Sequence, residues 1–335
     1  MRIVVTGGAG FIGSNLIIKL IERFPEMEVM NLDKLTYASD LKYIEAVKEN
    51  NRYRFKKVDL VDRVAVKAII KKFQPQGVFH LAAESHVDNS IKGPEDFIQS
   101  NIVGSFNLLE ECRQLWGSEE FRGDGIIPRF IHVSTDEVYG SLGDDGAFVE
   151  NHPFRPNSPY SASKAASDLV VRSYSKTFGM NVITTHCSNN YGPHQHDEKL
   201  IPTIIKSALA GKPIPVYGNG LNVRDWLYVA DHCEALIALF EHGTAGETYN
   251  IGGNNEWSNI ELVHEICSLL DELKPSDDQN SYKDLITFVE DRKGHDFRYA
   301  IDASKLKNAI GWEASDDFKT MLKETVNYYL NRFCF

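Results

Sequence analysis

Short apolar runs alternate with longer amphipathic stretches through the first half of the chain. The apolar runs are rich in β-branched residues and nearly continuous, which is typical of strands buried on both faces of a parallel sheet. We expect strands at residues 2–6, 29–32, 55–58, 78–82, 130–134 and 182–186. Helical periodicity predicts helices at residues 14–24, 41–50, 63–73, 94–116 and 162–178. This alternation of strand and helix predicts an α/β fold with a doubly wound parallel sheet.

After about residue 187 this rhythm breaks, and loops rich in Gly, Pro and Asn separate shorter helices. We therefore expect a first domain at residues 1–187, with a later segment near 222–250 returning to it. Residues 188–335 are expected to form mainly a smaller C-terminal α/β substrate-binding domain. The stretch KPSDDQNSYK at residues 274–283 is polar and without periodicity, so an exposed loop is predicted there.

Composition narrows the classes of partner. The 335 residues include 36 Lys and Arg against 47 Asp and Glu, a formal net charge of −11. This balance argues against nucleic acid and anionic membrane surfaces, because both need a dense basic patch. No apolar run approaches the roughly 18–20 residues that span a bilayer, and the first residues lack the features of a signal peptide. The five cysteines are isolated, so we predict neither disulfides nor a metal site, and a cytoplasmic location.

A glycine-rich segment follows the first predicted strand and opens the first helix. Gly7, Gly10 and Gly13 have the G-x-x-G-x-x-G spacing. Positions without side chains let the backbone approach a pyrophosphate, and the helix N-terminus supplies N–H donors. Asp33 lies 33 − 13 = 20 residues past the last glycine, where a carboxylate binds a ribose diol. Its charge favours NAD, although the adjacent Lys34 weakens that preference. We predict a Rossmann-like dinucleotide-binding domain.

Asp59 ends the third predicted strand and has two interpretations. It can reach the adenine of a bound dinucleotide, or it can cap the next helix by accepting a backbone N–H. The sequence leaves both open.

Tyr160 and Lys164 lie four residues apart in YSASK, on one face of a predicted helix. A phenol has a pKa of about 10, so a tyrosine base needs a nearby ammonium that favours the phenolate. A surface helix pair would give the same spacing, but the glycine loop and Ser134-Thr135 at a strand end favour catalysis. Together these features resemble the short-chain dehydrogenase/reductase superfamily. The chain length and the added C-terminal segment resemble its extended branch, which acts on nucleotide sugars.

Two adjacent carboxyl side chains, Asp136 and Glu137, follow Thr135 at the mouth of a predicted strand. Active sites of α/β sheets gather at this edge, and two neighbouring carboxyls suit a reaction that needs an acid and a base together. Adjacent strand residues point to opposite faces, so the chain must turn at Asp136 if both act on one substrate. A solvated turn is the alternative.

Nearly the whole sequence is similar to the dTDP-glucose 4,6-dehydratase family. The matching blocks lie in both halves and read TGGAGFIGSN, NLDKLTYA, HLAAESHVDNS, STDEVYGS, SPYSASKAASD, CSNNYGPHQ, EKLIP, PVYGNGLNVRDWLYV, YNIGG and DRKGHDFRYAID. One position departs from the family pattern, because Asn89 stands where the family usually has Arg. That departure leaves the nucleobase open, so dehydration of UDP- or CDP-glucose and 4-epimerisation stay as alternatives. A non-catalytic NAD-binding scaffold is a further alternative, but the presence of Asp136, Glu137, Tyr160 and Lys164 argues against it.

The resemblance implies a lyase that converts dTDP-glucose to dTDP-4-keto-6-deoxyglucose with NAD. Tyr160, assisted by Lys164, takes the proton from the sugar O4 while hydride passes from C4 to NAD. Glu137 then removes the C5 proton, and Asp136 protonates the departing C6 hydroxyl. Hydride returns to C6, and Thr135 hydrogen-bonds the oxygen at C4.

The resemblance also implies two sets of binding residues. The NAD set comprises Gly7, Gly10, Phe11, Ile12, Gly13, Asp33, Lys34, Thr36, Asp59, Leu60, Leu81, Ala82, Ala83, Ser100, Tyr160, Lys164 and Asn190. The substrate set comprises Ser85, Thr135, Asn189, Lys199, Leu200, Pro215, Tyr217, Arg224, Asn259, Asp291, Arg292 and His295. Arg224 is the expected partner of the substrate pyrophosphate, with an ion pair to Asp225 or Asp231 as the alternative. Tyr217 either stacks on the nucleobase or is a strand aromatic.

The remaining expectations concern three histidines and two helices. His194 and His196 resemble a metal pair but belong more naturally to a polar loop, and His80 is expected to be a hydrogen-bonded core residue. The helices predicted at 94–116 and 162–178 have wide apolar faces. In this superfamily such a pair forms a dimer contact, so a homodimer is expected, although core packing alone would give the same pattern.

Overall fold

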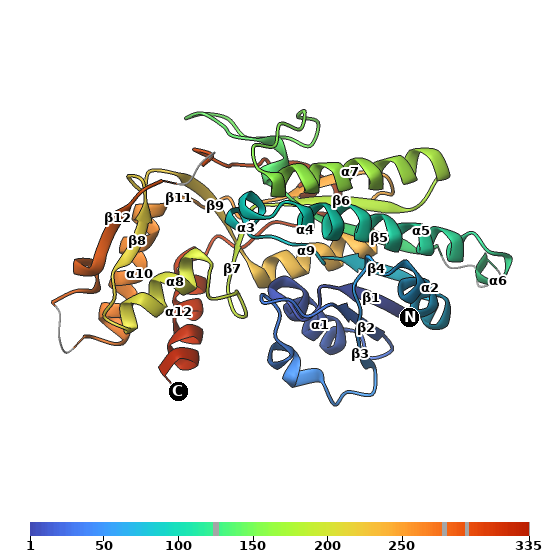
Figure 1. The fold of residues 1–335 in the computed structure, drawn as a ribbon, viewed down its shortest axis with the longest axis horizontal. Helices are drawn as coiled ribbons and strands as arrows, with labels where there is room; N and C mark the ends of the chain where they lie inside the picture. Colours follow the sequence, from blue (N-terminus) through green and yellow to red (C-terminus); the bar gives the residue numbers. More distant parts are fainter. Residues whose placement is uncertain (123–126, 277–279, 292–294, 335) are drawn as a thin grey trace.

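The computed structural model describes residues 1–122, 127–276, 280–291 and 295–334. Its centre is a seven-stranded sheet in the order β10-β6-β5-β4-β1-β2-β3, in which every neighbouring pair is parallel (Figure 1). The strands are β1 (Arg2–Thr6), β2 (Glu28–Asp33), β3 (Tyr53–Lys57), β4 (Gly77–His80), β5 (Arg129–Thr135), β6 (Val182–Cys187) and β10 (Thr248–Ile251). The predicted doubly wound parallel sheet is confirmed.

Helices cover both faces of this sheet. One face carries α1 (Phe11–Arg23) and α9 (Val229–His242), and the other carries α2 (Arg63–Phe73), α5 (Ser105–Trp116) and α7 (Pro159–Phe178). The strand β1 shows why its sequence is continuously apolar. Ile3 and Val5 pack into the core with α1 and α9, whereas Val4 packs into the core with α2, α5 and α7. Since strand side chains alternate between faces, a strand covered on both sides needs apolar residues throughout.

Two predicted helices differ in kind from the expectation. The segment predicted as one helix at 94–116 consists of α4 (Glu95–Phe97), a π-helix η2 (Ile98–Gly104) and α5. The segment predicted at 41–50 is a 3₁₀-helix, η1 (Leu41–Val47). Helix periodicity over a window averages out the local change of pitch that distinguishes these forms.

The helix α7 begins three residues before the predicted start. Ser158 caps it by accepting the N–H of Ser161, whose hydroxyl in turn accepts the Ser158 N–H, and Pro159 occupies the first helical position. Proline is suited to this position because its missing N–H would be unpaired there anyway. The cap places Tyr160 and Lys164 in the first turns of a helix that runs alongside β5 and β6.

Most of the second half packs around its own apolar core beside the main sheet (Figure 1). Its sheets are β11-β9-β7 and β12-β8, built from β7 (Asn189–Tyr191), β8 (Ile214–Tyr217), β9 (Val223–Tyr228), β11 (Glu256–Ser258) and β12 (Ile286–Val289). Its helices are α8 (Leu200–Leu209), α10 (Asn259–Leu273) and α12 (Phe318–Cys334). Short helical elements occur in both halves of the chain. The first half contains α3 (Val87–Lys92), α6 (Glu119–Arg122) and η3 (Asp136–Tyr139), and the second half contains η4 (Tyr282–Leu285) and α11 (Ser304–Ile310). Although they follow β9 in the sequence, α9 and β10 belong to the main sheet and its α1 face.

A membrane-spanning helix would need a long apolar stretch. None of the helices in the described part of the chain is long and apolar enough to cross a bilayer.

Candidate active site

The turn between β1 and α1 leaves room for backbone only. At Gly7, where φ is +68°, an added Cβ would lie 2.8 Å from the backbone of Ala82. At Gly13 it would lie 2.2 Å from the carbonyl oxygen of Gly7. Gly10 precedes α1 without a side-chain cap, so the first N–H groups of α1 remain available to a ligand. The turn is therefore built for close approach of an anionic group to the backbone.

A cavity of about 310 Å³ opens beside this turn, at the carboxyl ends of the parallel strands. It is lined by the whole predicted NAD set: Gly7, Gly10, Phe11, Ile12, Gly13, Asp33, Lys34, Thr36, Asp59, Leu60, Leu81, Ala82, Ala83, Ser100, Tyr160, Lys164 and Asn190. It is also lined by the catalytic candidates Thr135, Asp136 and Glu137 and by the substrate candidates Ser85, Asn189 and Lys199. One cavity thus brings together residues from both halves of the sequence.

Asp33 lies at the end of β2 and is 7% exposed. Its carboxylate accepts the N–H of Ala9 at 2.9 Å and of Leu35 at 2.8 Å. Burial raises the pKa of Asp33, and these hydrogen bonds oppose the rise. Lys34 is directed elsewhere, since its ammonium donates to Ser100 Oγ at 2.7 Å and pairs with Glu84 at 3.0 Å. The acidic end of the cavity therefore keeps its negative character despite the adjacent lysine.

Asp59 is not the cap of α2. Asp62 holds that position, accepting the N–H of Ala65 at 3.0 Å, whereas Asp59 accepts the N–H of Val61 at 2.9 Å. Asp59 lines the cavity, so the geometry favours contact with a bound ligand over capping of α2.

The two adjacent carboxyls stand where the chain leaves the sheet. Thr135 ends β5, and the 3₁₀-helix η3 begins at Asp136, so the expected turn at this position is present. The Thr135 hydroxyl accepts the N–H of Glu137 and donates to Asp136 Oδ1, both at 3.3 Å. The turn places Asp136 and Glu137 in the lining of the same cavity as Tyr160.

Asp136 has the environment of a neutral carboxylic acid. It is 2% exposed, and its Oδ2 atom has no hydrogen-bond partner within the described ranges. Burial and then the negative charges of Glu137 and Asp225 raise its pKa well above the ordinary value, and Arg224 only partly opposes them. A raised pKa favours the protonated form of the carboxyl, which can donate its proton.

Tyr160 and Lys164 are both buried on α7. The Lys164 ammonium donates to the Val133 carbonyl at 2.8 Å, and burial lowers its pKa. Burial and the charge of Glu137 raise the pKa of Tyr160, whereas a hydrogen bond with Thr135 lowers it. The lysine is thus fixed against β5 one helical turn from the phenol that it is expected to assist.

Eight predicted substrate residues lie outside the cavity lining or outside the described residues. Leu200 and Asn259 begin α8 and α10, and Pro215 and Tyr217 lie on β8. His295 Nδ1 lies 2.6 Å from Asp291 Oδ1, and the His295 ring makes an edge contact with Tyr217. Arg292 falls outside the described residues.

Arg224 is 7% exposed on β9, and its guanidinium donates to the carbonyls of Val223, Asp296 and Phe297 at 2.7–3.2 Å. It also stacks on the Tyr299 ring, 4.5 Å from the centroid. Asp225 and Asp231, the two alternative ion-pair partners of Arg224, bind backbone groups instead. Asp225 accepts the N–H groups of Gly253 and Asn255, and Asp231 accepts the N–H of Ser315.

Asn89, the position that departs from the family pattern, lies on α3. Its amide donates to the Tyr37 hydroxyl at 3.2 Å. Tyr37 in turn makes an edge contact with His196, which lines the cavity. Asn89 therefore contacts the rim of the cavity through one intervening side chain.

Several residues escaped the sequence analysis. Asn101, in the π-helix η2, binds both the N–H and the carbonyl of Glu84 and donates to Ser163 Oγ at 2.8 Å. Asp168, one turn after Lys164, is buried among hydrogen-bond donors. The Tyr-x₃-Lys-x₃-Asp spacing, which puts three polar residues on one helix face, was the available signal for Asp168.

His80 is the hydrogen-bonded core residue that was expected, and His194 contacts other side chains. His80 is buried and bonded to Thr6 and Ser105, both at 2.7 Å. His194 bonds Ser14 and stacks on Tyr43. Across the described residues, no group of three or more potential ligands could hold a metal ion.

A family model described as GDP-mannose 4,6 dehydratase matches residues 4–325. The dTDP-glucose 4,6-dehydratase of Xanthomonas campestris pv. campestris is 52% identical over 98% of this chain and 92% of that protein. The Escherichia coli dTDP-glucose 4,6-dehydratase is 50% identical over 99% of this chain and 94% of that protein. The chain belongs to the dTDP-glucose 4,6-dehydratase family. Its predicted membership is confirmed.

Solved structures of this dehydratase family share the whole fold. The Streptomyces venezuelae enzyme with NAD and a dTDP ligand bound aligns with a TM-score of 0.89 at 41% identity, covering 99% of this chain and 97% of that chain. A UDP-glucose 4-epimerase from Thermotoga maritima aligns with a TM-score of 0.85 at 28% identity, covering 99% of each chain. Since dehydratases and epimerases have the same fold, the reaction has to be argued from the site.

Proposed function

We propose that this protein is a hydro-lyase that carries out the NAD-dependent 4,6-dehydration of dTDP-glucose to dTDP-4-keto-6-deoxyglucose. The observation that carries the proposal is the placement of Asp136 and Glu137 beside Tyr160 and Lys164 in one cavity. An epimerase moves hydride from and to one carbon, whereas a dehydratase also has to remove a proton and expel a hydroxyl. The adjacent carboxyls supply those two additional proton transfers.

The residues present suit NAD. The turn at Gly7–Gly13 leaves room for a pyrophosphate against the backbone. Asp33 and Asp59 line the same cavity and are proposed to contact the ribose and the adenine. The apolar residues Phe11, Ile12 and Leu60 line the same cavity. The chemistry that bound NAD supplies is reversible hydride acceptance.

Tyr160 and Thr135 act at the sugar C4. Thr135 hydrogen-bonds O4, and Tyr160 takes the O4 proton, with Lys164 supplying positive charge from the same helix face. Loss of the O4 proton together with the C4 hydride leaves the 4-ketone, which makes the C5 hydrogen acidic.

Asp136 and Glu137 then divide the elimination. Glu137 takes the proton from C5, and Asp136 gives its proton to the hydroxyl that leaves C6 as water. Burial and the charge of Glu137 raise the pKa of Asp136, which favours the protonated form that its proposed role as the acid requires. Glu137 returns its proton to C5 when C6 is reduced.

The rest of the substrate is assigned to Ser85 and to residues of the second half of the chain. We propose that Ser85, Asn189 and Lys199 contact the sugar and the adjoining phosphate, because they line the cavity next to Thr135. The remaining substrate candidates surround β8 and the start of α10, and they are proposed to hold the nucleotide. For Arg224, binding a pyrophosphate would require its guanidinium to exchange a backbone carbonyl for a phosphate oxygen.

The test is product analysis by mass spectrometry with dTDP-, UDP- and CDP-glucose. We expect dTDP-glucose to lose about 18 mass units, the signature of dehydration. An isomer of unchanged mass would indicate an epimerase, and faster loss of water from UDP- or CDP-glucose would reassign the nucleobase. Protein that carries NAD but leaves all three substrates unchanged would contradict catalysis. Glu137→Gln is the matched control and should abolish the loss of water.

We also propose a homodimer and a division into two domains. Apolar side chains of Ile98, Phe106, Leu169 and Phe178 are 37–57% exposed along η2, α5 and α7, which would favour pairing of these helices with a second copy. Leu169→Glu should convert the dimer to monomer in light scattering. The domain division is proposed at residue 187, with the segment predicted at 222–250 returning to the NAD-binding domain through α9 and β10, since β9 belongs to the second sheet. The cytoplasm is the proposed location, supported by four buried cysteines that are free thiols.

A further inference from the structure

Two residues of opposite charge follow each other where the dinucleotide ribose is proposed to lie. Asp33 ends β2, Lys34 comes directly after it, and both line the cavity. In dinucleotide-binding folds an acid at this place binds the ribose hydroxyls of NAD, whereas a nearby cation accepts the 2′-phosphate of NADP. The position of the Lys34 ammonium therefore bears on which of the two cofactors the cavity accepts.

The Lys34 ammonium is held by two partners other than Asp33. It donates to Ser100 Oγ at 2.7 Å and pairs with the Glu84 carboxylate at 3.0 Å. Within the described ranges no ion pair joins it to Asp33. The side chains of Lys34 and Glu84 are 31% and 14% exposed, so water screens this pair less than it screens a pair on the open surface.

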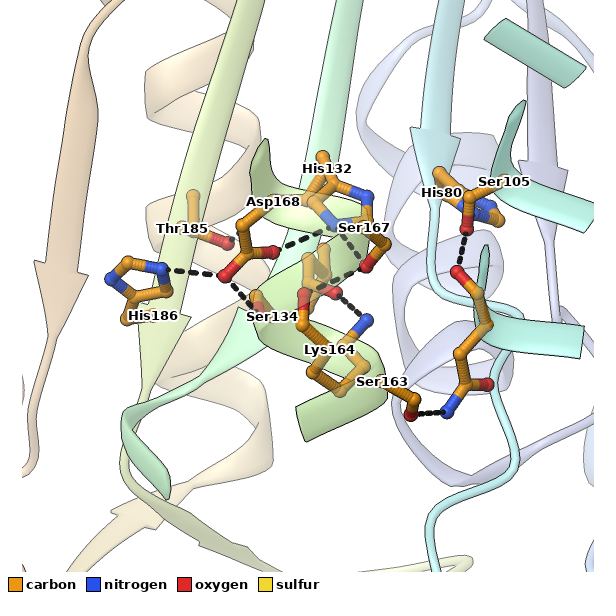
Figure 2. A network of polar contacts seen from close by, with 12 residues as sticks. His80, Ser105, His132, Ser134, Ser163, Lys164, Ser167, Asp168, Thr185 and His186 are labelled. Carbon is orange, nitrogen blue, oxygen red and sulfur yellow. Dashed lines mark hydrogen bonds and ion pairs between the residues drawn. The ribbon is translucent and has the colours of Figure 1, made fainter. Parts of the chain in front are cut away.

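The backbone of Glu84 is fixed by a buried side chain. Asn101, which is 1% exposed in η2, accepts the N–H of Glu84 at 2.8 Å and donates to its carbonyl at 3.0 Å. The same amide donates to the hydroxyl of Ser163 at 2.8 Å, and Ser163 adjoins Lys164 on α7 (Figure 2). Since Asn101 directly follows Ser100, neighbouring residues of one π-helix hold the lysine and the backbone of its carboxylate partner.

The other lysines near the cavity have different places. Among the described residues, three lysines and no arginine line it. Lys164 and Lys199 donate to backbone carbonyls elsewhere in the cavity. Lys57 is the cross-strand neighbour of Asp33, but it lines a separate hollow beside the cavity. Lys34 is thus the lysine of the lining that lies next to Asp33.

We propose that Glu84 is a specificity-determining residue for the cofactor: by holding Lys34 at Ser100, it withdraws the cation that a 2′-phosphate would need, and together with Asp33 it excludes NADP. This inference rests on the proposed function, because it uses the placement of the NAD ribose at Asp33. A phosphate of this kind carries roughly 1.5 to 2 negative charges at neutral pH. It would meet Asp33 while the charge of Lys34 is already balanced by Glu84. Removing the Glu84 carboxylate changes the net charge here by +1 and releases the lysine.

Asp33 and Glu84 should act together rather than independently. In the presence of Asp33, a released Lys34 can pair with the Asp33 carboxylate, which again leaves little positive charge for a phosphate. When Asp33 is replaced by Asn, a 2′-phosphate becomes the strongest partner that a released Lys34 can find. Glu84→Gln should therefore favour NADP more strongly in the Asp33→Asn background than in the wild type.

The test is competition between the two cofactors. Each protein is incubated with an excess of an equimolar mixture of NAD and NADP until the bound fractions are constant, and mass spectrometry then measures the ratio of bound NADP to bound NAD. Relative to wild type, we expect Glu84→Gln to raise this ratio about threefold, Asp33→Asn about tenfold, and the double variant at least about a hundredfold. A merely structural weakening of the cavity would lower the binding of both cofactors and leave the ratio unchanged.

Further variants identify the route of the effect. Lys34→Met, added to the double variant, should return the ratio to that of Asp33→Asn, because the released cation is then absent. Lys57→Met is its matched control and should leave the ratio of the double variant within about twofold. Glu45→Gln removes the carboxylate of an exposed ion pair with Lys48, and it should keep the wild-type ratio.

Three results would overturn the proposal. One is a double variant with the same ratio as Asp33→Asn, and another is a gain that survives Lys34→Met, since Glu84 would then act by direct repulsion. The third is a tenfold fall of the wild-type ratio in Lys34→Met, because the lysine would already face the phosphate; this result decides even if Glu84→Gln does not fold. An Asp33→Asn variant with the wild-type ratio contradicts the proposed ribose placement instead.

Discussion

Replacing Asp136 by Asn separates the acid step from the rest of the reaction. The amide has the shape of the protonated carboxyl and can still accept the Thr135 hydroxyl hydrogen bond, which is 3.3 Å long in the structure. It has no proton of comparable acidity to give to the C6 hydroxyl. We expect kcat for water loss to fall roughly 10²–10⁴-fold, the usual contribution of a general acid. Oxidation at C4 should continue, so absorbance near 340 nm should rise when substrate is added.

The same substitution has a predicted effect on stability. Because the folded pKa of Asp136 is raised, by burial first and by Glu137 second, the folded state keeps a proton that the unfolded state releases. Stability of the wild type therefore falls as pH rises from the unfolded carboxyl pKa towards the folded one. The slope over that window is about 1.4 kcal/mol per pH unit. Asp136→Asn lacks this loss, so its stability relative to wild type should increase with pH.

Urea unfolding of both proteins at pH 5 and pH 8 measures this difference. Asp302→Asn is a control without a slope between these two pH values. Hydrogen bonds with Ser304 lower the pKa of Asp302, so its stabilising effect is complete at both pH 5 and pH 8 and is lost only as pH falls below the ordinary carboxyl pKa. A difference between Asp136→Asn and wild type that is the same at both pH values would refute the neutral-acid assignment. Unchanged dehydration by the variant would refute its catalytic role.

Three further outcomes are expected. Gly13→Ala should lose copurified NAD, measured by the ratio of absorbance at about 260 and 280 nm, because its Cβ would lie 2.2 Å from the Gly7 carbonyl oxygen; Gly143→Ala, with open space around it, is the control. Tyr160→Phe should keep NAD but lose roughly 10²–10⁴-fold in kcat, and rapid turnover would contradict its role as base. Tyr329→Phe removes a buried 2.6 Å hydrogen bond to the loop after β7, so urea unfolding should show a loss of about 1 kcal/mol, and no loss would mean that the bond is dispensable.

Local patterns were sufficient to predict most of the main sheet. Strands such as β1 and β6 are buried on both faces, and this leaves an unbroken apolar run in the sequence. The glycine turn was equally predictable, since Gly7 and Gly13 are required by close backbone contacts. By contrast β10 has four residues and forms only by pairing with β6, more than sixty residues earlier, which a local pattern does not reveal.

The candidate site likewise contains some residues that the sequence predicts and others that it does not. Residues that meet a ligand through a local motif, such as Asp136 and Lys164, could be named from the sequence with help from the family resemblance. The environment of Asp168 could not be predicted, because its hydrogen-bond partners His132 and His186 come from two other elements. The environment of Arg224 was also beyond sequence reasoning, since the carbonyls around its guanidinium include those of Asp296 and Phe297, more than seventy residues away.

The late return of α9 and β10 to the main sheet limits how this chain can be divided. A fragment that stopped at Cys187 would leave the backbone groups of β6 unpaired along a new sheet edge. It would also uncover the apolar residues of α1 and β5 that α9 shields. Exposed edges and apolar faces promote aggregation. Expression of the first 187 residues alone should therefore give insoluble material, whereas a fragment that supplies residues 223–251 in trans would restore the missing strand and helix.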